Sequence, residues 1–129
     1  MNKLAAVAGA LLGLLFIASA VTYLFKLVPM PPPPEGTPLA LFFGAMAPTH
    51  YFDFIKILEL IGGALIAIPI TRRLGLLILG PIIVNILAAH VFLMGGEGLA
   101  NPLLIAIVVL TLFLVYVERR AFAAFLRGG

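Results

Sequence analysis

The sequence contains no cysteine, and only a tenth of its 129 residues are charged. The lack of cysteine excludes disulfides, thiolate ligands and cysteine-bound iron–sulfur clusters within this chain. The scarcity of charge is equally informative, because soluble domains are about 45–50% apolar. This chain is 64% hydrophobic and has a mean hydropathy of +1.25. These values predict an integral membrane protein. Nucleic acid is not expected as a partner, because the sequence contains no basic patch interleaved with aromatic residues.

The chain contains four apolar runs, and we expect an all-α fold built as a four-helix transmembrane bundle. The first run exceeds the 7–15 apolar residues of a signal peptide, although Ala18-Ser19-Ala20 resembles a cleavage site and keeps that alternative open. All four runs belong to one predicted membrane domain, residues 1–129, with spans at 4–27, 51–70, 74–93 and 102–117. Thr71-Arg72-Arg73 is expected to end the second span, and Asn101-Pro102 is expected to start the fourth.

Basic residues are distributed unevenly among the segments that join these spans. If the N-terminus lies inside, the cytoplasmic side receives Lys3, Arg72, Arg73, Arg119, Arg120 and Arg127. Membrane proteins retain lysine and arginine on the cytoplasmic side. We therefore expect a multi-pass protein of the cell membrane with both termini in the cytoplasm.

Two segments outside the spans carry structural signals. The outer loop, residues 28–50, begins with a proline-rich stretch at 29–34 that predicts a polyproline II strut. Thr37-Pro38 then predicts the start of a short helix, with threonine as its N-cap. The cytoplasmic tail, residues 118–129, places Phe122, Phe125 and Leu126 on one side, which is typical of a short interfacial helix.

The second span, capped in our prediction by Thr49, carries Asp53, Lys56 and Glu59 at three-residue steps. This spacing places them on neighbouring parts of one helix face. Glu59 falls near the middle of the bilayer, where a charged carboxylate costs about 2.5–3.5 kcal/mol, so it is expected to face protein. Two interpretations remain open: an ion pair with Lys56 or Lys26, or a protonated carboxyl.

The predicted topology brings several of these polar residues to the outer leaflet, with two others deeper. We expect a polar-lined pocket or polar core formed by Lys26, Asp53, Lys56, Glu59, Asn85 and His90. Asn85 is interpreted as an interhelical hydrogen-bonding residue, and Gly62-Gly63 as a point of close helix approach. His50 and His90 lack an obvious third ligand, so no metal site and no catalytic residue is assigned.

The order of these motifs resembles the DoxX-like family of small four-helix membrane proteins. The matching residues run through nearly the whole chain: Lys26-Leu27, Tyr51-Phe52, Glu59 with Gly62-Gly63, Arg73, Pro81, Val84-Asn85-Ile86 and His90-Val91-Phe92. The resemblance implies a four-helix bundle linked with membrane redox systems, including quinone-reducing or quinol-oxidising complexes. The chain departs from the expected pattern in its first helix, where Ala18-Ser19-Ala20 precedes Lys26 and the start is apolar.

Three functional hypotheses follow. The first is an accessory subunit of a membrane redox assembly, not catalytic alone, whose pocket accepts a quinone or a lipid. The second is a small transporter or proton-conducting element that uses Glu59. The third is an assembly factor for another membrane protein. The expected partners are the lipid bilayer, a membrane or peripheral oxidoreductase, and a second copy of this chain.

Overall fold

The computed structural model describes residues 2–29 and 31–128, and the regular structure in this part of the chain consists of helices without strands. The all-α prediction is therefore confirmed. The elements are α1 (Asn2–Leu24), α2 (Pro38–Met46), α3 (Tyr51–Ala67), the 3₁₀ turn η1 (Pro69–Thr71), α4 (Arg72–Phe92), α5 (Pro102–Val117) and α6 (Arg119–Leu126). Met30, within the predicted proline strut, lies outside the described residues.

In the described part of the chain, two helical stretches are long and apolar enough to cross a membrane, Lys3–Leu24 and Pro69–Phe92. A third is obtained if Pro102–Val117 and Arg119–Leu126, which are bent by 69° relative to each other, are taken as one span. Helix α3 has 17 residues. At 1.5 Å per residue it reaches about 25 Å, short of the roughly 30 Å hydrocarbon core. Two to three candidate spans thus agree with a membrane protein, and the four-span topology stays a prediction.

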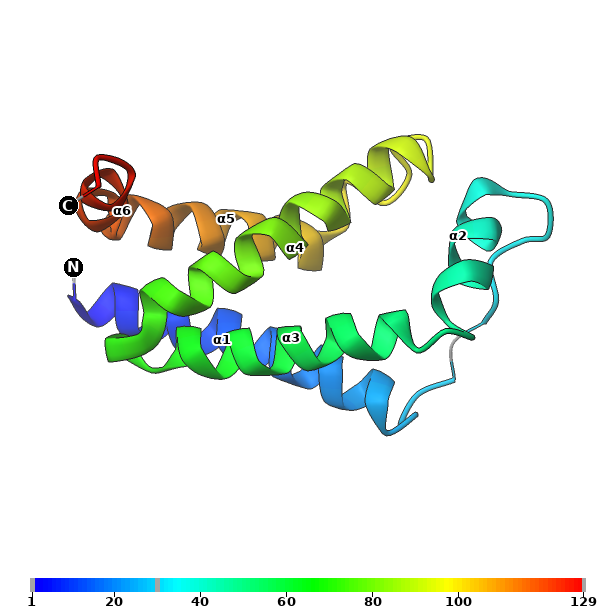
Figure 1. Cartoon of the computed structure of the whole chain (residues 1–129), viewed down its shortest axis with the longest axis horizontal. Coiled ribbons are helices and arrows are strands. Elements are labelled where there is room, and N and C mark those ends of the chain that lie inside the picture. Colours follow the sequence, from blue (N-terminus) through cyan, green and yellow to red (C-terminus); the bar gives the residue numbers. More distant parts are fainter. Residues whose placement is uncertain (1, 30, 129) are drawn as a thin grey trace.

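The four long helices run alternately between two ends of the molecule (Figure 1). The N- and C-termini lie at one end with the η1 turn, which we call the terminal end. The opposite end, called the loop end, carries residues 25–50 and 93–101. Helix α3 packs most extensively against α1 and next against α4. Helices α3 and α4 meet at the terminal end and diverge toward the loop end (Figure 1).

Glycines allow α1, α3 and α4 to approach one another closely. A Cβ atom added at Gly63 would lie 2.8 Å from the carbonyl oxygen of Gly13, and one added at Gly75 would lie 2.6 Å from the backbone nitrogen of Ile66. Real Cβ atoms do not approach backbone this closely, so side chains at these positions would separate the helices. The prediction that Gly62-Gly63 permits close helix approach is confirmed, since a Cβ at Gly62 would meet Leu79 at 2.7 Å.

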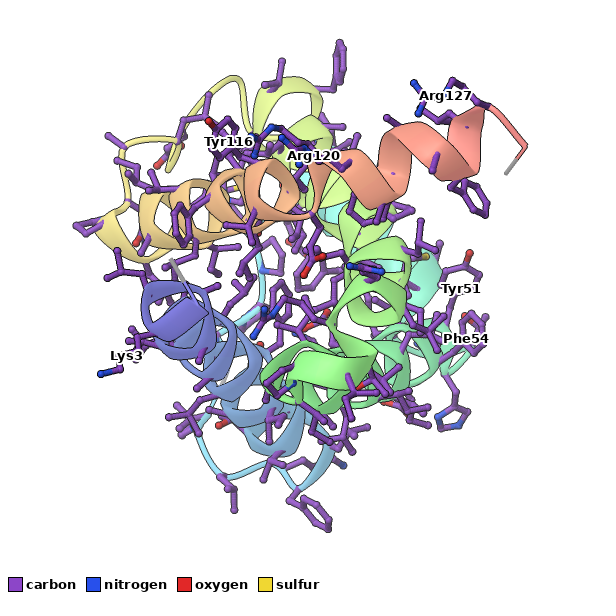
Figure 2. The ribbon with its side chains drawn as sticks, turned by 90° about the vertical axis from the view of Figure 1, so that its left-hand side faces the viewer. Lys3, Tyr51, Phe54, Tyr116, Arg120 and Arg127 are labelled. Carbon is purple, nitrogen blue, oxygen red and sulfur yellow. The ribbon has the colours of Figure 1, made fainter. Side chains whose placement is uncertain are left out.

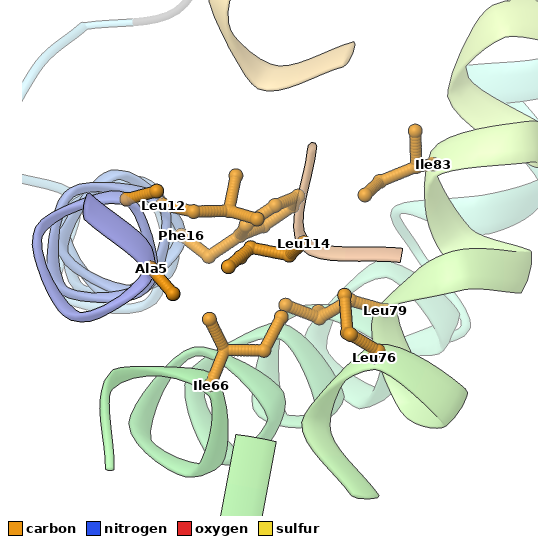
Figure 3. Close-up of a cluster of buried hydrophobic side chains, with 9 residues drawn as sticks. Ala5, Leu12, Phe16, Ile66, Leu76, Leu79, Ile83 and Leu114 are labelled. Carbon is orange, nitrogen blue, oxygen red and sulfur yellow. The ribbon is translucent and has the colours of Figure 1, made fainter. Parts of the chain in front are cut away.

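The core lies where these helices meet. It is formed by small and branched apolar side chains (Figure 3): Ala5, Ala8, Leu12, Phe16, Ile66, Leu76, Leu79, Ile83 and Leu114. The α1 members recur every three or four residues, which places them along one face of the helix. The opposite faces expose large apolar side chains, among them Leu14 on α1, Leu74 on α4 and Leu112 on α5. Such an exterior suits lipid contact better than water.

Two helix starts lie where capping residues and prolines predicted them, and two other predicted boundaries need correction. Thr37 caps α2 by accepting from the Ala40 backbone nitrogen, and Asn101 caps α5, so these predicted starts are confirmed. The prediction that Thr49 caps the second span is wrong: His50 occupies the N-cap position of α3, and the Thr49 hydroxyl donates to Ala45 and Met46 carbonyls.

The second correction concerns the end of α3. We expected the second span to reach residue 70 and Thr71-Arg72-Arg73 to form a tight connection after it, whereas the two arginines begin α4. The reason is Pro69, which pushes the preceding Ile68 into an extended conformation and so ends α3 at Ala67. The Thr71 hydroxyl then donates to the carbonyl oxygen of Leu65 at 2.7 Å and stabilises the turn.

Candidate functional site

An open surface pocket of about 450 Å³ lies at the loop end, between the proline stretch and α2. Its lining is almost entirely apolar and consists of Tyr23, Pro31, Pro32, Pro33, Ala40, Phe43, Gly44, Ala47 and Pro48. We call it the proline-loop pocket. A pocket beneath the proline loop was expected, but a polar lining was not found, because none of the six predicted polar residues contributes to its wall.

An aromatic cluster centred on Phe52 fixes the short helix α2 over this pocket. The Phe52 ring lies 4.9 Å from the Phe43 ring, 5.7 Å from the Phe42 ring and 6.1 Å from the Tyr23 ring, between centroids. All three contacts have edge-to-face geometry, which contributes about 0.5–1.5 kcal/mol per pair beyond burial. Helix α2 is thereby attached to the end of α1 and the start of α3.

A polar network lies next to Tyr23, on the bundle side of the pocket. The Lys56 ammonium donates to the Ser19 hydroxyl of α1 at 3.1 Å and to the Glu59 carboxylate at 3.3 Å. It also lies 5.7 Å from the centre of the Tyr23 ring. Glu59 is only 4% exposed, whereas the Lys56 side chain is 22% exposed, so the carboxylate of this ion pair is buried and the lysine is partly accessible. We call these residues the Lys56 network.

The structure thus selects Lys56 as the partner of Glu59. Lys26 is exposed just beyond α1, with a left-handed backbone (φ 52°), and forms no ion pair among the described residues. Asp53, although on the same helix, pairs with the exposed His50 at 2.9 Å rather than joining Lys56. Of the three α3 residues predicted to share a face, only Lys56 and Glu59 are brought into contact.

The two predicted residues on α4 lie apart from this network. Asn85 is exposed, and its side chain forms no hydrogen bond within the described part of the chain, so its predicted interhelical role is wrong. His90 donates from Nδ1 to the Ile86 carbonyl oxygen of its own helix at 2.8 Å, and its ring packs against Gly98.

A second charged cluster, at the terminal end, was not predicted as an interaction. Glu118 accepts from Arg73 at 2.7 Å and lies 3.7 Å from a guanidinium nitrogen of Arg72. Arg72 is 95% buried, and its Nε and Nη2 atoms have no hydrogen-bond partner in the described structure. One sequence feature could have indicated this cluster. Thr71-Arg72-Arg73 and Glu118-Arg119-Arg120 each follow a predicted span, and the predicted topology places both on the cytoplasmic side.

Comparisons with known proteins add no further constraint: neither family models, nor curated proteins, nor solved structures match this chain. Among the described residues, no three histidine, aspartate or glutamate side chains gather in a group able to hold a metal ion. The proline-loop pocket and the adjacent Lys56 network are therefore the best candidate for a functional site, argued from their geometry alone.

Proposed function

We propose that this chain is a DoxX-like, four-span protein of the cell membrane that binds a quinone or a lipid in the proline-loop pocket. In this proposal it serves as an accessory subunit of a membrane redox assembly. The observation that carries the proposal is the pocket itself, whose size falls within the range of about 300–1,000 Å³ typical of small-molecule sites. Its proline and aromatic lining suits an apolar ring or chain.

Two features support binding of a molecule with a polar head. Tyr23 is the one lining residue with a polar side chain. Its ring both lines the pocket and lies next to the Lys56 ammonium. Lys56 is held in place by Ser19 and Glu59, which limits the motion of its ammonium group. A quinone carbonyl or a lipid headgroup bound in the pocket would contact Tyr23, whose ring centre lies 5.7 Å from the Lys56 ammonium.

Packing supports four spans even though α3 and α5 are short. Helix α3 contacts the middle of α1, where Gly63 meets Gly13, and contacts α4 through Gly62 and Gly75. Since α1 and the stretch containing α4 are long enough to span, a helix packed between them shares their depth in the bilayer. A span a few ångströms short of the hydrocarbon core costs only fractions of a kcal/mol per Å, through local thinning.

Topology is tested by reporter fusions along the full-length sequence. We expect fusions after Arg73 and Arg127 to report the cytoplasm, and fusions after Gly36 and Gly98 to report the opposite side. The pair Gly36 and Arg73 is decisive, because these residues flank α3. If both report the same side, α3 does not cross the membrane and the four-span proposal fails.

Ligand binding is tested by filling the pocket. Gly44 lies on α2 and lines the pocket, and a Cβ atom added there meets nothing within 4 Å. A Gly44→Leu variant is expected to retain about tenfold less quinone or lipid after purification in mild detergent, because overpacking costs about 1–3 kcal/mol. Extraction of the purified protein followed by chromatography and mass spectrometry measures the retained molecule.

The matched control is Gly80→Leu. Gly80 lies on α4, also has open space for a side chain, and is not part of the pocket. The control is expected to retain as much ligand as the unmodified protein. Equal retention in both variants would show that the pocket is not the binding site. Co-purification of an oxidoreductase supports the redox-assembly part of the proposal.

The buried carboxyl supports one alternative function, that of a small transporter or proton-conducting element. Glu59 is nearly inaccessible, and Lys56 is its only described partner. A proton-linked activity of the purified chain alone, lost in Glu59→Gln, would favour this alternative over an accessory subunit.

A further inference from the structure

The C-terminal helix α6 has two chemically different sides at the terminal end. It turns by 69° away from α5, so it lies across the end of the bundle rather than continuing the span. Phe122 packs against the core, whereas Phe125 and Leu126 are 67% and 83% exposed. The apolar side of α6 is therefore only partly packed against the bundle, and its C-terminal part is exposed.

The other side of α6 carries exposed arginines. Arg120 and Arg127 are separated by seven residues, which is two helical turns, so they project from the same side, away from Phe122. Arg127 points away from the bundle in the view from the terminal end (Figure 2). Arg119 is fixed differently: its guanidinium stacks over the Tyr116 ring at 4.1 Å and donates to the Tyr116 carbonyl oxygen.

The charge of the terminal end is strongly unbalanced. Among the residues that the structure describes, Glu118 is the acidic side chain next to α6, and it is 11% exposed and already shared by Arg72 and Arg73. Arg120 and Arg127 form no ion pair within the described structure. Their charges are consequently free to attract an anion of external origin.

We propose that α6 binds anionic phospholipid, with Phe125 and Leu126 among the acyl chains and Arg120 and Arg127 on the headgroup phosphates. A helix with exposed apolar residues on one side and arginines on the other is built for the membrane interface. The terminal end, in the proposed topology, faces the cytoplasmic leaflet, which carries the anionic lipids. This surface is separate from the proline-loop pocket, which lies at the loop end.

The test uses the full-length protein in mild detergent, titrated with phosphatidylglycerol or with phosphatidylcholine and followed by native mass spectrometry. A basic residue near an anionic membrane surface contributes about 1 kcal/mol to the binding free energy, which corresponds to about a fivefold change in affinity. We expect Arg120→Gln with Arg127→Gln to reduce phosphatidylglycerol binding about 25-fold and to leave phosphatidylcholine binding unchanged. Inorganic phosphate at equal ionic strength should not displace the lipid, because it lacks the acyl chains.

Lys26→Gln is the matched control, since Lys26 is also exposed and has no ion-pair partner among the described residues but lies at the loop end. It should leave phosphatidylglycerol binding unchanged. The double arginine variant should keep the melting temperature of the unmodified protein, because both side chains are exposed. Equal binding of the two lipids, or unchanged phosphatidylglycerol binding in the double variant, would overturn the proposal.

Discussion

Changing Glu118 to glutamine is expected to lower the free energy of unfolding by about 3–5 kcal/mol, the usual result of removing one partner of a buried ion pair. The loss of stability arises because the substitution leaves Arg72 without a carboxylate partner. Arg72 is 95% buried, and Glu118 is its only described carboxylate partner. Its Nε and Nη2 atoms already lack hydrogen bonds in the described structure. Thermal unfolding of the purified protein in mild detergent provides the measurement.

The neighbouring Arg73 provides a matched control for the Glu118→Gln variant. Arg73 makes the shorter contact with Glu118, at 2.7 Å, but its side chain is 64% exposed. Arg73→Gln is expected to cost only about 0–1 kcal/mol, as exposed ion pairs do. Adding Arg72→Met to Glu118→Gln should recover part of the lost stability by removing the stranded charge. If Glu118→Gln were as mild as Arg73→Gln, the carboxylate would not be what stabilises Arg72.

Glutamine at Glu59 is expected to destabilise the protein by about 3 kcal/mol. The substitution leaves the Lys56 ammonium with the Ser19 hydroxyl as its remaining hydrogen-bond acceptor in the described structure. The expected cost lies at the lower end of the range for buried pairs because the Lys56 side chain is 22% exposed. Adding Lys56→Met to Glu59→Gln should restore part of the stability, since no stranded charge remains.

The full set of single and double variants measures the coupling directly. Lys26→Met is the control for a lysine that does not contact Glu59, and its effect should simply add to that of Glu59→Gln. A Glu59→Gln protein as stable as the original would instead indicate a neutral carboxyl, for which glutamine is nearly isosteric. Loss of a proton-linked activity in that stable variant would then support the alternative function.

Much of the secondary structure could be predicted because its signals are local. Thr37-Pro38 and Asn101-Pro102 marked helix starts through a capping side chain and a proline at the first helical position. Gly62-Gly63 marked a close helix contact, because glycine is the residue that lets backbones approach. The error at Arg72 was also local: we placed the end of the second span at residue 70 and the start of the third at 74, whereas Pro69 ends α3 at Ala67 and the arginines already belong to α4.

The polar site was predicted less well, because it depends on how each helix is rotated about its axis. Helices α1, α4 and α5 expose large apolar side chains, so no polar stripe in the sequence marks the side that faces the core. Asn85 illustrates the consequence: a lone amide in an apolar helix was expected to point inward, yet it is exposed.

The sequence by itself determined the helical class, the apolar exterior and the concentration of basic residues in segments that meet at one end, since these follow from composition and order along the chain. Tertiary structure alone decided which polar groups touch. Lys56 reaches Ser19 across 37 positions, and Arg73 reaches Glu118 across 45. Such contacts arise because glycines bring particular helix faces together, and a one-dimensional pattern does not specify the relative rotation and depth of packed helices.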